Sequence, residues 1–196
     1  MSDLSSLKLI SGRKIIDHFH LNYSDALTYD YESPSDFMNE MWSRYDSGQV
    51  SMNGSVFEGL LATILYREGI SPIYIQANLA FVPNVNFDFV VYTKEVGPIV
   101  LSAKTSLRER YKQADLEGMM LRQVHRKSEC YLITLNKNEA RSVQKKINEG
   151  QVLGLDKVYL ADENGFNELV EHLKSFTLYQ PDKIDIITSK RIISGK

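Results

Sequence analysis

The chain has one cysteine, one tryptophan and five prolines among its 196 residues. The single cysteine, Cys130, excludes disulfides within the chain, and its apolar neighbours predict a place in a core strand. No Cys/His cluster has the spacing of zinc ligands, so any bound metal would be held by oxygen atoms. No apolar run approaches the ~20 residues of a membrane-spanning helix, and no signal-peptide core follows Met1. These absences predict a soluble, cytoplasmic protein without membrane contact.

The chain also lacks a strong excess of charge of either sign. Its formal net charge is −2, which excludes a polycation that coats nucleic acid indiscriminately. The charge is unevenly distributed along the chain, however. The segment from Lys104 to Lys127 holds seven basic and three acidic residues, a net charge of +4, so the rest of the chain carries a net charge of −6. A basic segment on an acidic body is expected of a site-directed nucleic-acid binder, although a solvated helix face is the commoner reason for such a run.

The spacing of apolar residues predicts an α/β fold. A length of 196 residues with 43% hydrophobic composition suits one core and hence a single domain, residues 1–196. The first part of the chain predicts helices and then an antiparallel strand meander with Pro and Gly turns. These helices are 13–20, 35–45 and 55–69, and the strands are 73–82, 87–93 and 99–104.

In the second part, predicted helices alternate with predicted strands. The helices are 108–126, 138–150 and 163–176, the strands are 129–135 and 157–161, and residues 182–196 add an edge strand or a tail. Alternation of this kind is typical of parallel strands joined by crossover helices. The sequence therefore predicts a mixed central sheet with helices on both faces.

Two charged residues are expected at one end of this sheet. Period-two alternation in the strand from Phe87 to Tyr92 places Asp88 on the face opposite to Phe87 and Phe89. Lys104 ends the following strand, so a hairpin would bring it close to Asp88. An aspartate that holds Mg²⁺, beside a lysine that steadies the attacking water or the scissile phosphate, supports hydrolysis of a phosphodiester.

The helix after Lys104 begins with Arg108-Glu109-Arg110 and places Arg110, Gln113 and Glu117 on one face. Arginine donates two hydrogen bonds to guanine O6 and N7, and glutamate accepts one from cytosine N4, so this triplet suits adjacent G·C pairs. Two arginines at a helix N-terminus oppose the helix dipole, which favours a functional reason over a merely charged helix start.

Asp88, followed by Lys104 at the end of the next strand, resembles the PD-(D/E)xK nuclease fold. The chain departs from that pattern in having Phe87 where the family has proline and Ser102 where it has a second acid. The second departure resembles the type II restriction endonucleases that cut sites containing CC and GG, the PspGI, SsoII and EcoRII type. In that branch a glutamate thirteen residues after the lysine replaces the acid, and Arg-(Asp/Glu)-Arg lies four to six residues after it; here these are Glu117 and Arg108 to Arg110.

The resemblance implies roles for individual residues. It makes Asp88 and Glu117 ligands of Mg²⁺, with the carbonyl of Ala103 as a third, and places Lys104 beside the nucleophile. It implies an outer carboxylate at Glu58, for which a capping box with Ser55 is an alternative explanation. Arg108, Glu109 and Arg110 would read bases. Lys112 would contact a phosphate, although a solvated face is the commoner role.

The function implied is a Mg²⁺-dependent type II restriction endonuclease that cuts both strands of duplex DNA at a short palindromic site containing CC and GG. It would act as a homodimer in a prokaryotic cytoplasm, beside a DNA methyltransferase that protects the host's sites. Two alternatives stay open. One is a repair or junction nuclease of the same fold, against which Arg-Glu-Arg argues. The other is a catalytically inactive DNA-binding protein, for which Ser102 is the best support.

Overall fold

The computed structural model of the chain describes residues 3–45, 50–181 and 187–193. Its α-helices are α1 Arg13–Asn22, α2 Pro34–Ser43, α3 Asn53–Arg67, α4 Arg110–Val124, α5 Lys137–Asn148 and α6 Asn164–Lys174, with a 3-10 helix, η1, at Val50–Met52. Its strands are β1 Ile73–Leu79, β2 Phe87–Thr93, β3 Gly97–Ala103, β4 Glu129–Thr134, β5 Lys157–Leu160 and β6 Ile187–Ile193. Among the described residues no helix is long and apolar enough to cross a membrane.

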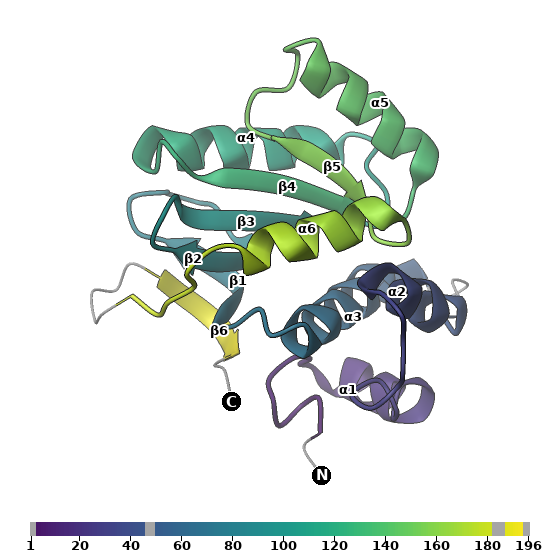
Figure 1. Cartoon of the computed structure of the whole chain (residues 1–196). Helices are drawn as coiled ribbons and strands as arrows, with labels where there is room; N and C mark the ends of the chain where they lie inside the picture. The colour runs from purple at the N-terminus through teal and green to yellow at the C-terminus, as the bar shows by residue number, and fades with distance from the viewer. Residues whose placement is uncertain (1–2, 46–49, 182–186, 194–196) are drawn as a thin grey trace.

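The strands form a six-stranded mixed sheet in the order β5-β4-β3-β2-β1-β6 (Figure 1). Strands β6, β1, β2 and β3 pair antiparallel, whereas β3, β4 and β5 pair parallel. Short connections join β1 to β2 and β2 to β3, the crossover helices α4 and α5 allow the parallel pairs, and β6 comes from the far end of the chain to pair with β1. The predicted mixed α/β sheet is confirmed, and the edge strand expected within 182–196 is β6, apart from residues 182–186 and 194–196, which lie outside the described part.

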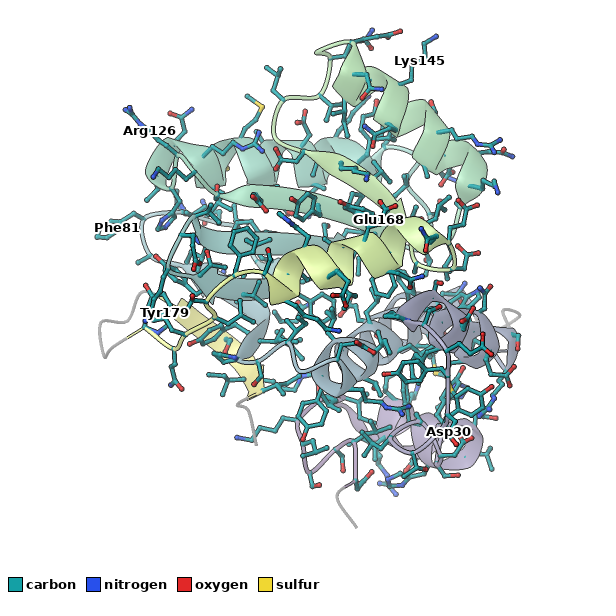
Figure 2. All side chains as sticks on the ribbon, viewed as in Figure 1. Asp30, Phe81, Arg126, Lys145, Glu168 and Tyr179 are labelled. Carbon is teal, nitrogen blue, oxygen red and sulfur yellow. The ribbon has the colours of Figure 1, made fainter. Side chains whose placement is uncertain are left out.

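Helices cover both faces of the sheet (Figure 1). One face packs against α2, α3 and α6, through buried residues such as Leu60, Phe89 and Leu169. The other packs against α4 and α5, and its cluster includes Leu121 and Cys130. Figure 2 shows that Lys145 on α5 and Glu168 on α6 point outward; their side chains are 76% and 61% exposed. The apolar interior therefore lies on the two sides of one sheet.

The alternation of faces breaks at Gln76 in β1. Ile75 belongs to the core on the α3 side, whereas Ala77 belongs to the core on the α4 side. On β2, Phe87 lies in the α4-side core and Phe89 in the α3-side core, so the expectation that these two share a face is wrong. Gln76 has a φ of +51°, and the left-handed backbone at this position accounts for the switch.

Candidate active site

Asp88 lies at the start of β2, where the register of β2 with β3 sets it beside Ser102 and Ala103. Its Oδ2 accepts hydrogen bonds from Lys104 Nζ at 2.5 Å, from the Ala103 backbone N–H at 2.9 Å and from Ser102 Oγ at 3.2 Å. The side chains of Asp88 and Lys104 are only 10% and 14% exposed. The structure thus brings together the aspartate and the lysine that the hairpin predicted, in a setting that strengthens their ion pair.

Glu58 reaches the same place from α3. The side-chain amide of Gln76 joins it to Asp88, since Gln76 Nε2 donates to Glu58 Oε2 at 3.2 Å and to Asp88 Oδ1 at 3.4 Å. Burial raises the pKa of Glu58 to about 7, the charge of Asp88 adds to the rise, and Lys104 opposes it. The capping box with Ser55 is wrong, because α3 begins at Asn53 and Ser55 lies inside the helix.

Glu117 approaches from α4, on the other face of the sheet from α3. Its Oε1 accepts a hydrogen bond from Gln113 Nε2 at 2.7 Å, which fits their shared helix face. Burial raises the pKa of Glu117, and Lys104 and Asp88 act on it electrostatically in opposite directions. Glu58 and Glu117 therefore both lie within the field of the Asp88–Lys104 pair.

These acids suit a divalent cation chemically. Carboxylate oxygens from Asp88 and Glu117, with the carbonyl oxygen of Ala103, are the hard ligands that Mg²⁺ prefers. Across residues 3–45, 50–181 and 187–193, no group of three His, Cys, Asp or Glu side chains is near enough to hold a metal in this arrangement. The mutual repulsion of Asp88 with Glu58 and with Glu117 would be relieved by a cation. The chemical types of these ligands suit the ion, and the magnesium site stays a prediction.

The Arg-Glu-Arg segment lies in front of α4 instead of entirely within it, because the helix begins at Arg110. Arg108, Glu109 and Arg110 are exposed, and Glu109 forms an ion pair with Lys112. All three residues of the segment line a groove of about 1060 Å³ that Glu58 also lines. Trp42, Asn53 and residues 136–138 also line this groove. The predicted base-reading residues and one of the predicted carboxylates thus border one open space.

Gln76, Arg191 and Glu139 could not be singled out from the sequence. Arg191 lies on β6, opposite Ile75 of β1, in the stretch that was expected to be an edge strand or a tail. Its Nε and Nη1 atoms are buried and have no hydrogen-bond partner among the described residues. With Glu58 and Gln76 it lines a cavity of about 290 Å³. Strand β6 reads Ile-Thr-Ser-Lys-Arg-Ile-Ile, and among these polar neighbours nothing in the sequence marks Arg191 as a buried arginine.

Glu139 supports the Arg-Glu-Arg segment from α5. Its Oε2 accepts the backbone N–H of Leu107 at 2.6 Å, and Leu107 is fully buried. The backbone of the next residue, Arg108, has a φ of +25°, so the segment turns sharply before α4. A long-range contact of this type leaves no periodic pattern in the sequence, and only the structure reveals it.

Comparison with known proteins bears on the fold. No protein-family model matches the chain, and no curated protein matches it. A solved structure that resembles it is that of the restriction endonuclease PspGI with its substrate DNA. That likeness has a TM-score of 0.54 and 13% sequence identity, and it covers 94% of this chain and 85% of the other. At so low a sequence identity the likeness is evidence for the fold alone, and the chain has a restriction-endonuclease-like fold.

Proposed function

We propose that the chain is a Mg²⁺-dependent type II restriction endonuclease that cuts both strands of duplex DNA at a short palindromic site containing CC and GG. The observation that carries this proposal is the groove that Glu58 shares with Arg108, Glu109 and Arg110. A base-reading segment and a catalytic centre must face the same duplex. The fold likeness to PspGI, whose structure was determined with substrate DNA, supports the proposal.

In this proposal each group near Asp88 has a chemical task. Asp88, Glu117 and the Ala103 carbonyl would hold Mg²⁺, which when bound lowers the pKa of water and offsets phosphate charge. The ammonium of Lys104 would donate to the attacking water or to the scissile phosphate. Ser102, through its hydroxyl, and Ala103, through its N–H, orient Asp88. Glu58 would act as an outer carboxylate.

Recognition would come from the exposed segment before α4. Arg108 and Arg110 would donate to guanine O6 and N7, and Glu109 would accept from cytosine N4. Glu109 is paired with Lys112, so this pair would open when the protein meets DNA, leaving Lys112 to contact a phosphate. A palindromic site requires a homodimer with one active site per chain. A cognate methyltransferase would protect the host DNA in the prokaryotic cytoplasm.

The alternative of an inactive DNA-binding protein rests on Ser102 in the place of an acid. In the structure the hydroxyl of Ser102 donates to Asp88 Oδ2, which is a supporting role compatible with a working site. A repair or junction nuclease of this fold would need no base-reading triplet. Arg108, Glu109 and Arg110 therefore favour the sequence-specific enzyme over a repair or junction nuclease, and the cleavage assay separates it from the inactive DNA-binding protein.

The test is cleavage of plasmid DNA in Mg²⁺, with Lys104→Ala and Glu117→Ala in parallel and the ends mapped by sequencing. Discrete double-strand cuts at sites containing CC and GG, lost in both variants while DNA binding persists, are the expected result. Scattered cuts would indicate a nuclease without base recognition. Binding without any cleavage in Mg²⁺ or Mn²⁺ would indicate the inactive protein, and cleavage by Glu117→Ala would remove that glutamate from the catalytic set.

A further inference from the structure

Gln76 adopts a backbone conformation that is unusual within a strand. Its φ of +51° lies in the left-handed region, while β1 pairs with β2 on either side of it, through Ile75 with Phe89 and Ala77 with Phe87. Non-glycine residues held in this region store conformational energy and concentrate at functional sites. The fold thus maintains a strained conformation within a strand that is paired on both sides of it.

The result of this conformation is that the carboxamide of Gln76 lies between two carboxylates. Its Nε2 donates to Glu58 Oε2 at 3.2 Å and to Asp88 Oδ1 at 3.4 Å. Its Oε1 accepts from Asn86 Nδ2 at 2.8 Å, so Asn86 fixes which end of the amide faces the acids. Both N–H hydrogens are thus directed at the carboxylates, where they offset negative charge.

The two oxygens of Asp88 differ in their surroundings. Oδ2 accepts from Lys104, Ser102 and the Ala103 N–H, whereas Oδ1 accepts only the long bond from Gln76 among the described residues. Oδ1 is therefore the carboxylate oxygen that can still bind a cation. The charge of Asp88 also contributes to the raised pKa of Glu58, so the two carboxylates repel each other in the absence of a cation. The Gln76 amide counters that repulsion.

We propose that Gln76 is a positioning residue for a divalent cation, whose carboxamide holds Glu58 and Asp88 in place and so keeps Asp88 Oδ1 available as a ligand. The inference rests on the proposed function, which needs a cation at Asp88. It assigns a purpose to the strained conformation at Gln76 and to the bond from Asn86. Partners that orient metal-binding groups typically contribute about 10–100-fold to metal affinity.

The test is Mn²⁺ binding to the full chain by isothermal titration calorimetry, without DNA. Gln76→Met keeps the length of the side chain and the backbone conformation but removes both donors, and we expect it to weaken Mn²⁺ affinity by about 10–100-fold. Asn86→Ala should weaken binding in the same direction by a smaller factor. Asn78→Leu is the matched control, because Asn78 lies on the same strand and its amide donates to the Val85 carbonyl, outside the site.

A second readout separates positioning from a general loss of structure. With Gln76→Met, plasmid cleavage should require more Mg²⁺ for its half-maximal rate, while saturating Mg²⁺ should largely restore that rate. Unchanged Mn²⁺ affinity in Gln76→Met, with tight binding by the unaltered chain, would overturn the role of Gln76 and leave the proposed function standing. Equal weakening in Asn78→Leu would also overturn it. If the unaltered chain binds no Mn²⁺, both the inference and the metal-dependent function fail.

Discussion

At the scale of single residues, the site is a balance of charges around Asp88. One ammonium, from Lys104, lies among three carboxylates that approach from a strand and from helices on both faces of the sheet. Lys104, Gln76 and the buried Arg191 favour the charged form of Glu58, whereas burial and Asp88 oppose it and outweigh them. The ionised carboxylates are therefore not fully compensated by the basic groups near them, which is a physical reason to expect a cation there.

This imbalance predicts how stability depends on pH in metal-free buffer. Folding raises the pKa of Glu58 from 4.5 to about 7, so the folded state binds this proton more tightly than the unfolded state. The stabilising contribution of protonated Glu58 to the free energy of unfolding is thus fully present below pH 4.5 and is lost as the pH rises to about 7. Glu58→Gln should raise the melting temperature by several degrees at pH 8 and change it little at pH 4.5.

Thermal melts of both proteins at the two pH values provide the measurement, and pH 4.5 is the internal control. An equal change at the two values would mean that the substitution alters packing and not the cost of a buried charge. A lower melting temperature at pH 8 would mean that the ionised form of Glu58 stabilises the fold, which contradicts the raised pKa.

Residue types and local sequence patterns were enough to predict the pairing of Asp88 with Lys104. Both lie on adjacent strands of one hairpin, whose turn residues and alternation are local properties of the sequence. Gln76 and Arg191 could not be predicted in the same way. Gln76 faces the site because of a single unusual φ angle, and Arg191 comes close only when β6 pairs with β1, over 100 residues away along the chain.

At the scale of elements, α5 supports the segment that precedes α4. The N-terminus of α5 is capped by Asn136, whose Oδ1 accepts the Glu139 N–H at 3.1 Å. This places the Glu139 carboxylate against the Leu107 N–H, immediately before Arg108. The backbone directly before the exposed Arg-Glu-Arg segment is therefore anchored to a neighbouring helix, while the residues of the segment line the groove.

We expect Glu139→Ala to reduce sequence discrimination more than DNA affinity in general. It leaves the buried Leu107 N–H without its acceptor, at a cost of about 1–3 kcal/mol, and releases the turn at Arg108. The measurement is the ratio of affinities for DNA with and without CC/GG sites. Glu139→Gln, which retains an acceptor oxygen, should recover most of that ratio, and Lys145→Ala on the exposed side of α5 should not change it. If Glu139→Ala leaves this ratio of affinities unchanged, the hydrogen bond between Glu139 and Leu107 has no role in sequence recognition.

Long, regular elements were predicted well, and their ends less so. Strand β2 has the predicted bounds 87–93, because a β-branched and aromatic run between turn residues leaves little ambiguity. The start of α3 was misplaced because a Ser-x-x-Glu pattern also fits residues inside a helix, where Glu58 bonds to Gln76 instead. The face assignment of Phe87 failed because period-two alternation assumes ordinary strand dihedrals on both paired strands, and Gln76 lacks them.

At the scale of the whole molecule, the residues proposed for recognition and those proposed for cleavage are positioned by one sheet. Helices α3 and α4 bring Glu58 and Glu117 to the Asp88–Lys104 pair from opposite faces, and the Arg-Glu-Arg segment follows directly after Lys104. Under the proposed function, a chain with this arrangement would present one catalytic centre to one strand of a duplex. Cutting both strands at a palindrome therefore requires a second chain related by a two-fold axis.

The proposed homodimer leads to a prediction that concerns both of its chains. Mixed dimers of unaltered and Lys104→Ala chains, carrying different affinity tags and isolated by two purification steps, should nick supercoiled plasmid at the recognition site and accumulate open circles. The unaltered dimer should produce linear DNA, and the Lys104→Ala dimer should leave the plasmid supercoiled. Each product is distinguished on an agarose gel. If the mixed dimer produces linear DNA at the rate of the unaltered dimer, a single active site cuts both strands in turn. The model in which each chain of the dimer cuts one strand would then be wrong.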